Sequence, residues 1–398
     1  MTSNTPDLES LQRVSQLHRA VRPKDIVGFM TRVFEDELHS KTALSLAMAT
    51  IGVLHSASLG IHTIGRGLAL AMLLDSKHTT KQVDRLLSNS NVSLWRLFPS
   101  WVRFVLGARK EAVVAMDWTD FDDDDQTTIA LYMVTRHGRA TPLIWHTVYK
   151  STLKDKRNGY EDEVLQCLRD SLRADVRVTV LADRGFGDQK RYEHLRSLSF
   201  DYVIRFRQDI TLSDAVTDPK PAIDWLPSSG RATVVKNARV TADKFEVPAV
   251  VLVHDKSMKD PWCLATSRSD LSAREVIRLY GKRFSIEETF RDTKDIHFGM
   301  GLKATHIGDS RRRDRLLLLG AVAHTLLTLL GAAGERCGLD RKLRTNTSQK
   351  RQLSLYRQGS FWYEALPTMR PERLELLMHA YDEVLLEHEF FSENLGTI

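Results

Sequence analysis

Apolar residues recur at intervals of three and four along the first quarter of the chain, a spacing that predicts α-helices. The periodic stretches are residues 26–38, 43–54 and 64–74. Two shorter stretches, 79–87 and 94–106, enclose the polar turn Ser-Asn-Ser-Asn-Val-Ser and are similar to a helix-turn-helix, a weak signal because most all-helical domains contain such a pair. We therefore predict an all-helical first domain over residues 1–110, with helix from about Asp7.

The pattern changes at residue 111, where short apolar and β-branched runs replace the helical spacing. The predicted elements are strands at 113–116, 128–135 and 142–149, then a helix at 162–172, a strand at 178–182, a helix at 188–198 and a strand at 202–206. This order predicts an antiparallel meander continued by crossover units, and therefore a mixed sheet in an α/β fold.

Residues 208–268 carry short strands and turns, which predict a β-rich insertion. Helical spacing returns at residue 273 and continues nearly to the end. We therefore expect one core in two parts, 111–207 and 269–335, with the insertion 208–268 between them and a helical tail at 336–398. The apolar stretch 316–333 contains His324, Thr325 and Thr328, which favours a buried helix over a membrane span.

Composition is ordinary for a folded protein and excludes disordered, collagen-like and small disulfide-stabilised classes. The 398 residues have 57 Lys and Arg against 51 Asp and Glu, a formal net charge of +6. The charge is uneven: residues 1–110 sum to +6, 111–270 to −3 and 271–398 to +3. An acidic middle between basic flanks suits a metal-dependent enzyme that acts on a polyanion. Three widely spaced cysteines and an N-terminus without signal-peptide order predict a cytoplasmic protein.

Two aspartates, Asp117 and Asp183, each follow an apolar run that we predict to be a strand. Ligand sites of open α/β sheets lie at the carboxyl ends of strands. A single such Asp is more often a cap or turn residue, but two in one sheet make a shared cation competitive. The run Asp122–Asp125 lies between two predicted strands, where a charged hairpin loop is the simpler interpretation.

The segment 280–294 reads YGKRFSIEETFRDTK and carries the most specific pattern of the chain. At about 100° per residue, Tyr280, Arg283, Glu287 and Lys294 fall within an arc of roughly 60° on one helical face. A surface stripe of ion pairs would look similar. The set also suits a phosphodiester, with Glu287 on a metal ion and the two cations on the phosphates.

With this motif the chain resembles DDE transposases of the bacterial insertion-sequence-four family, whose Y-(2)-R-(3)-E-(6)-K signature is complete here. The resemblance extends to Asp117-Trp118-Thr119, to Asp183 followed by Arg184, and to Trp262 in Trp-Cys-Leu-Ala-Thr. It implies a ribonuclease-H-like, retroviral-integrase-like core interrupted by a β-strand insertion. It also implies a bacterial, nucleoid-associated protein.

The resemblance further implies the chemistry. Asp117, Asp183 and Glu287 would hold two Mg²⁺ ions, with Mn²⁺ as a substitute, for nicking of transposon ends, hairpin formation and resolution, and strand transfer. Trp262 would stack on a flipped base, with Trp225 as the competing candidate. The partners would be double-stranded DNA, as terminal inverted repeats and target, and a second copy of the chain.

Further phosphate contacts are expected from basic residues outside the signature. Lys81 and Arg85 belong to a basic cluster in the helical head, where a solvated face is an equal alternative. The run Arg311-Arg312-Arg313 opens a predicted helix, where cations oppose the macrodipole, so phosphate contact is favoured there. Two rival functions remain open: a ribonuclease-H-like nuclease without strand transfer, and a non-catalytic repressor derived from a transposase.

Overall fold

The computed structural model describes residues 23–34, 36–297, 299–345, 347–348 and 350–391. The helix expected from Asp7 lies outside these residues as far as residue 22. The chain divides into two compact units, each described by itself. The helical unit contains residues 1–108, 135–141 and 289–397, and the sheet unit contains 109–134 and 142–288.

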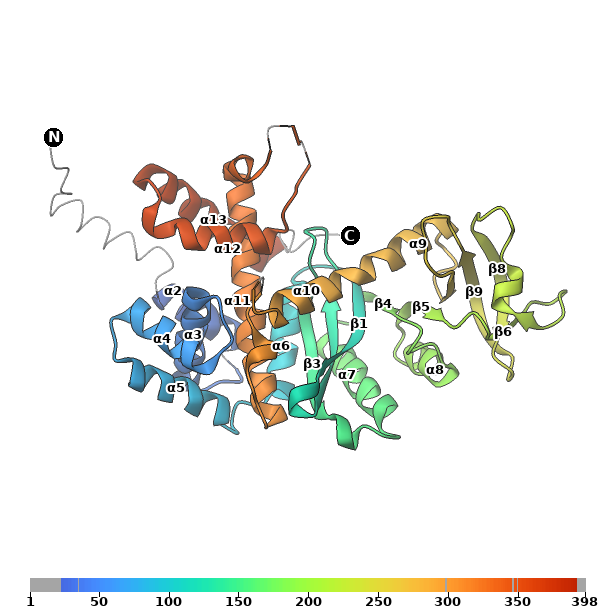
Figure 1. Ribbon diagram of the computed structural model, residues 1–398, viewed down its shortest axis with the longest axis horizontal. Helices are drawn as coiled ribbons and strands as arrows, with labels where there is room; N and C mark the ends of the chain where they lie inside the picture. The colour runs from blue at the N-terminus through green and yellow to red at the C-terminus, as the bar shows by residue number, and fades with distance from the viewer. Residues whose placement is uncertain (1–22, 35, 298, 346, 349, 392–398) are drawn as a thin grey trace. The chain divides into compact units, whose positions relative to one another are not determined.

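The helical unit is built around one long apolar helix, α11 (Ser310–Arg336). Helices α3 and α12 both pack on α11 (Figure 1). The other helices are α2 (Pro23–Phe34), α3 (Ser40–Ser56), α4 (Ile61–Met72), α5 (Ser76–Ser88), α6 (Leu94–Leu106), α12 (Leu355–Ala365) and α13 (Pro371–Phe391). The five helices predicted between residues 26 and 106 are thus confirmed, with small differences at their ends.

Helix α11 passes close to α12 because glycines remove side chains at the crossing. A methyl group on Gly359 would collide with the backbone oxygen of Leu327, and one on Gly331 with that of Leu355. Among the described residues α11 is the one helix long and apolar enough by itself to cross a membrane, and 94% of its apolar window is buried within the structure. This burial confirms the predicted core helix.

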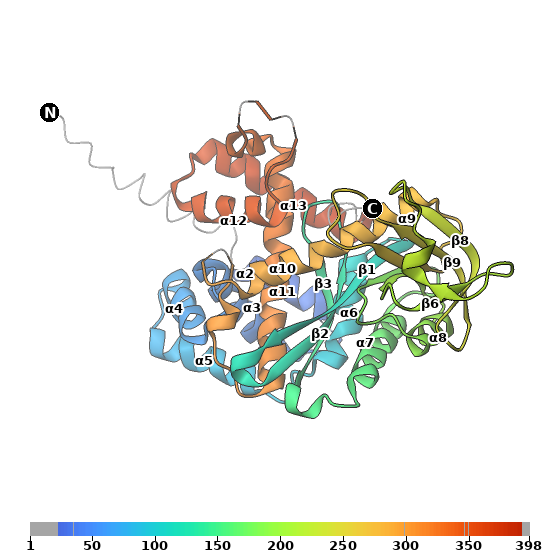
Figure 2. The same cartoon turned by 45° about the vertical axis from the view of Figure 1, so that its right-hand side comes forward.

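The sheet unit holds one ten-stranded sheet in the order β3-β2-β1-β4-β5-β10-β9-β8-β6-β7. Figure 2 shows β1, β2 and β3 side by side and, further along, β8 and β9. The strands are β1 (Glu111–Phe121), β2 (Gln126–Met133), β3 (Thr141–Tyr149), β4 (Arg177–Ala182), β5 (Asp201–Phe206), β6 (Thr211–Ser213), β7 (Lys220–Pro221), β8 (Thr233–Val240), β9 (Phe245–Val253) and β10 (Trp262–Thr266). Helices α7 (Arg157–Ser171) and α8 (Gln189–Ser197) occupy the two crossovers.

The predicted mixed topology is confirmed. Strand β1 pairs antiparallel with β2 and parallel with β4, and β4 pairs parallel with β5. The strands of the β-rich segment 208–268 do not form a separate sheet, because β10 pairs antiparallel with β5 and extends the same sheet outward. Strand β1 is also longer than the predicted 113–116 and runs past Asp117 to Phe121 on its partner β2.

Candidate active site

The parallel strands β1, β4 and β5 bring Asp117 and Asp183 to the same end of the sheet, one residue beyond their last shared row. Met116 of β1 pairs with Ala182 of β4, and Ala182 pairs with Ile204 of β5. The next residue of each strand segment is therefore Asp117, Asp183 and Arg205 respectively. Because side chains alternate along strands, residues one step beyond a common row point to the same face.

A buried arginine joins the first aspartate to the glutamate of the signature. Nη1 of Arg283 lies 3.0 Å from Oδ2 of Asp117, and Nη2 lies 2.7 Å from Oε1 of Glu287. The Arg283 side chain is only 6% exposed, whereas that of Glu287 is 48% exposed. Charge-assisted contacts of this kind are strong when water is excluded, so the guanidinium fixes two carboxylates that are 170 positions apart in the sequence.

Asp183 and Glu287 both act electrostatically on Asp117. Burial raises the pKa of Asp117 to about 6, against the lowering effect of the Arg283 charge. The negative charges of Asp183 and Glu287 raise the pKa further, while the backbone N–H of Trp118, 2.9 Å from Oδ1 of Asp117, lowers it. Negative charges that act together on one carboxyl in this way favour a bound cation at the same place.

The donor chemistry of this site fits a hard divalent cation. Asp117, Asp183 and Glu287 offer carboxylate oxygens, the ligands that Mg²⁺ and Mn²⁺ prefer. As they stand, no three His, Cys, Asp or Glu side chains in the described part of the chain are arranged to hold a metal ion. At this site Arg283 supplies a positive charge between Asp117 and Glu287. A metal ion here would have to take over those contacts.

The four signature residues do not lie on one uninterrupted α-helix, which corrects the predicted arc. Tyr280 lies in α9 (Ala273–Gly281), and Arg283 lies in a 3₁₀ turn, η4 (Lys282–Phe284). Glu287 and Lys294 belong to α10 (Ser285–Lys294). The tighter turn rotates Arg283 relative to an ideal α-helix. Lys294 falls in the helical unit, and its phosphate contact stays a prediction.

Aromatic side chains flank the acids. The rings of Trp262 and Tyr280 meet edge to face, with centroids 4.9 Å apart, and Trp262 also lies 6.3 Å from Phe284. Tyr280 is buried, and its predicted contact with DNA stays a prediction, whereas Trp262 is half-buried and Phe284 is exposed. Trp225 lies elsewhere, after the last strand of the sheet, where its indole N–H donates to Leu212 O at 3.2 Å.

A basic hollow of about 330 Å³ adjoins the row of acids, and sequence analysis found only part of it. Arg184, Arg205 and Arg207 line it together with Asp209 and Asp260. Arg205 donates to the Pro261 carbonyl at 3.0 Å, which holds it at the rim. Arg205 follows the residue of β5 that pairs with Ala182, and so lies in the same row as Asp183. This neighbourhood follows from the pairing of β4 with β5, which the sequence alone does not reveal.

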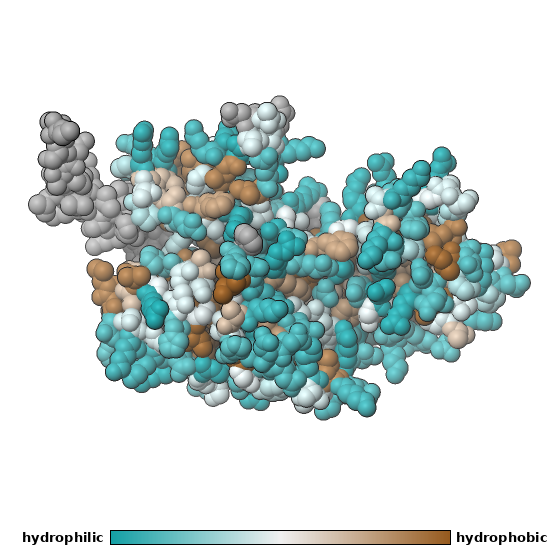
Figure 3. Space-filling model, viewed as in Figure 1, coloured by the Kyte–Doolittle hydropathy of each residue, from teal (hydrophilic) through white to brown (hydrophobic). Residues whose placement is uncertain are grey.

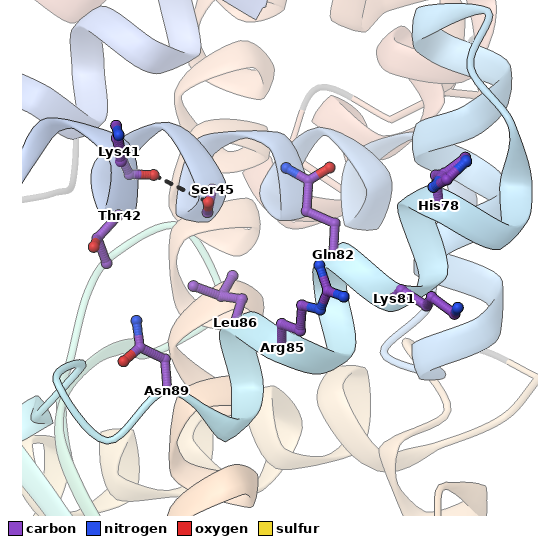
Figure 4. Close-up of a pocket in the computed structure, with 9 residues that line it drawn as sticks. All are labelled: Lys41, Thr42, Ser45, His78, Lys81, Gln82, Arg85, Leu86 and Asn89. Carbon is purple, nitrogen blue, oxygen red and sulfur yellow. Dashed lines mark hydrogen bonds between the residues drawn. The ribbon is translucent and has the colours of Figure 1, made fainter.

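The helical unit carries a second basic surface, a groove of about 810 Å³ between α3 and α5 (Figure 4). Lys41, Thr42 and Ser45 contribute from α3, and Lys81 and Arg85 from α5. His78, Gln82, Leu86 and Asn89 complete the lining, so the groove has no acidic residue. The face over α5 is hydrophilic (Figure 3). The predicted pair Lys81 and Arg85 therefore faces a cavity that suits an anion.

The run at the start of α11 is only partly exposed. Arg313 is fully buried, and its phosphate contact stays a prediction. Arg312 lies 2.7 Å from Asp84 and also bonds Ser88, so an ion pair within the helical unit already accounts for its charge. Arg311 is exposed, and its phosphate contact stays a prediction.

Comparison with known proteins adds one finding to this geometry. The model of a family described as "Transposase DDE domain" matches residues 146–326. The matched range includes Asp183, Arg283 and Glu287, and Asp117 precedes it. A search of the curated proteins found no match. The family match, together with the converging carboxylates, supports the interpretation of the chain as a DDE transposase.

Proposed function

We propose that the protein is a cut-and-paste DNA transposase of the hairpin-forming insertion-sequence-four type, with a ribonuclease-H-like catalytic core. One observation carries the proposal: Asp117 and Asp183 follow paired residues of adjacent parallel strands, and Arg283 joins Asp117 to Glu287. If the contacts of Arg283 with Asp117 and Glu287 only stabilised the fold, Asp183 would not be needed on the neighbouring strand.

Asp117, Asp183 and Glu287 would hold two divalent cations, Mg²⁺ or Mn²⁺. Bound there, such ions make a water or a 3′-hydroxyl more acidic and stabilise the leaving oxygen of an in-line displacement. The protein's own part is to gather the three carboxylates and to keep them anionic. In the free protein Arg283 contributes by holding Asp117 and Glu287, and its charge opposes the burial that raises the pKa of Asp117.

The arginines around the acids would position the scissile strand. Arg184, Arg205 and Arg207 line one hollow, which suits the phosphates next to the cleaved bond. Trp262 is the half-buried aromatic beside Tyr280, and its ring would stack on a base flipped out during hairpin formation. The place of Trp225 at the end of the sheet favours Trp262 for this role.

The groove between α3 and α5 would bind the terminal inverted repeat. Its cations neutralise backbone phosphates, while Gln82 and Asn89 offer amides of the type that read base edges. The tail, close to neutral in charge, would pair two copies of the chain so that both transposon ends are held together. This activity belongs in the bacterial cytoplasm, at the nucleoid.

A cleavage assay tests the proposal. A labelled duplex carrying the ends of the element that encodes the chain is incubated with Mg²⁺ or with EDTA, and the products are separated on a denaturing gel. We expect a nick that matures into a hairpin only with Mg²⁺. Non-specific degradation would indicate a nuclease without strand transfer. Binding without cleavage under Mg²⁺ and Mn²⁺ would indicate a non-catalytic repressor.

A further inference from the structure

We propose that Glu161 is a positioning residue that fixes the segment bearing Asp117 against the segment bearing Asp183. The inference rests on the proposed function and names a group that the signature does not contain. Glu161 lies on α7, and its side chain is 2% exposed. A fully buried carboxylate is costly unless donors satisfy it, so its partners indicate what it does.

The first partner belongs to the Asp117 segment. The indole N–H of Trp118 donates to Oε1 of Glu161 at 2.7 Å. Trp118 directly follows Asp117, and its backbone N–H donates to Oδ1 of Asp117 at 2.9 Å. One residue is thus anchored through its side chain to Glu161 and through its backbone to the catalytic carboxylate. A shift of the indole would therefore change the orientation of Asp117.

The second partner belongs to the Asp183 segment. Nη2 of Arg191, on α8, lies 2.6 Å from Oε2 of Glu161, and both side chains are almost completely buried. The chain from Asp183 to α8 is a short, bonded turn: Gly185 N–H donates to Oδ1 of Asp183 at 2.7 Å, and Asp188 caps the helix by accepting from the Arg191 N–H at 3.0 Å. Glu161 therefore holds the turn that carries Asp183.

A stacked arginine joins the same two segments a second time. The guanidinium of Arg157 lies 5.3 Å from the ring centre of Trp118 and 5.9 Å from that of Phe186, three residues after Asp183. Arg157 Nε also donates to Oε1 of Glu161 at 3.2 Å. Cation–π contacts of this kind orient rings as well as attract them. Two residues of one helical turn of α7 thus bridge both acid-bearing segments.

Glu161 does not act as a fourth ligand at the site. Oε1 accepts from Trp118 and Arg157, and Oε2 accepts from Arg191, so both oxygens face protein donors. Outer groups of this type orient the ligands of metal sites, and their loss typically lowers metal affinity by about 10- to 100-fold. The competing explanation is an ion pair that only stabilises the core.

The test compares Glu161→Gln, Trp118→Phe and the double variant with Leu168→Ala. Leu168 is a control on the same helix, because its buried side chain is apolar and takes no part in the hydrogen bonds of Glu161. Gln keeps an acceptor for Trp118 but loses the Glu161 charge opposite Arg191 Nη2, while Asp162 still bonds the other end of the guanidinium. Mn²⁺ affinity is measured by calorimetry without DNA, and the Mn²⁺ concentration for half-maximal cleavage is measured with DNA. Binding to the DNA end in EDTA and the melting temperature are recorded for every protein.

We expect Glu161→Gln and Trp118→Phe each to weaken Mn²⁺ binding by about tenfold. The double variant should bind Mn²⁺ less weakly than the product of the two single effects, because both act through the same contact. Binding to the DNA end in EDTA should be unchanged in all three. Leu168→Ala should lower the melting temperature without changing Mn²⁺ affinity. Wild-type Mn²⁺ affinity in both single variants would overturn the positioning role, even if they were less stable. A wild-type protein that binds Mn²⁺ but cuts no DNA would overturn the proposed function alone, and one that does neither would overturn both.

Discussion

Arg283 lies between Asp117 and Glu287, 3.0 Å from one carboxylate and 2.7 Å from the other, and is itself buried. The guanidinium therefore balances two of the three acids in the free protein. Binding of a divalent cation and a DNA phosphate would release these contacts, and the freed guanidinium is then available to the phosphate. The same residue serves both states because a guanidinium donates equally well to carboxylate and phosphate.

Loss of any one carboxylate should remove cleavage but not DNA binding. Asp117→Asn, Asp183→Asn and Glu287→Gln each withdraw one oxygen ligand at nearly constant shape. Because a bound cation contributes several kcal/mol to such a reaction, we expect cleavage to fall by about a thousandfold or more. End binding in EDTA, measured by gel shift, should stay within about threefold. If a variant still cleaves well, the carboxylate that it lacks is not catalytic.

Asp117 should make the folded protein less stable at neutral pH in the absence of metal. Its pKa is raised from an ordinary value near 3.8 to about 6. A raised carboxyl pKa contributes stability below the unfolded value that is lost as pH rises through the folded one. Asp117→Asn should therefore melt a few degrees higher than wild type at pH 7.5 in EDTA, and the difference should shrink with falling pH and vanish below about pH 3, as measured by calorimetry.

Asp214, which is half-buried, provides the control for this pH series. The backbone N–H groups of Thr217 and Val216 lower its pKa, which is the opposite direction. Asp214→Asn should show no gain in melting temperature at pH 7.5. Equal gains for both variants would mean that removal of negative charge in general, and not the environment of Asp117, accounts for the effect.

Trp262→Ala should separate nicking from hairpin formation. The ring lies beside Tyr280 and is the partly exposed aromatic group near the acids, so its loss should leave the first nick but reduce the hairpin by about tenfold or more, as expected when a base loses its stacking partner. Trp225→Ala, in a Trp anchored to Leu212 at the other end of the sheet, is the matched control. If only Trp225→Ala reduced hairpin formation, Trp225 and not Trp262 would be the residue that stacks on the flipped base.

Lys81→Ala and Arg85→Ala should each weaken end binding and lower its dependence on salt. Both line the groove between α3 and α5, and each neutralised phosphate contributes about one unit to the slope of log K against log salt. The control is Arg373→Ala, an exposed cation on α13 of the same unit. Fluorescence anisotropy across a salt series measures the slope, and unchanged slopes in both groove variants would exclude the groove as a DNA site.

Much of the fold follows from local pattern. Helical spacing gave the bounds of α3 to α6 to within a few residues, and the apolar run before Asp183 identified β4. Asp117 and Asp183 were recognisable because a carboxylate after an apolar run has no packing explanation. The extension of β1 past Asp117 was missed because its polar residues carry no strand pattern and are held by the hairpin pairing with β2.

The features that sequence analysis missed depend on contacts between distant segments. Arg205 joins the acids only through the register of β5 with β4, and Glu161 appears as an ordinary charged residue of an amphipathic helix until Trp118 and Arg191 meet it. The burial of Arg313, in contrast, could have been predicted from the sequence. Leu316 lies three residues later on the same helix face, belongs to an apolar stretch and is buried, so Arg313 is expected to point inward as well.

Strand transfer tests the central claim most directly. A duplex whose transposon end already carries a free 3′-hydroxyl is incubated with supercoiled plasmid and Mg²⁺, and joined products are scored on a gel for wild type and Glu287→Gln. The account predicts Mg²⁺-dependent joining of both ends by wild type and none by the variant. Plasmid that is hydrolysed but never joined, or joining that persists in Glu287→Gln, would contradict it.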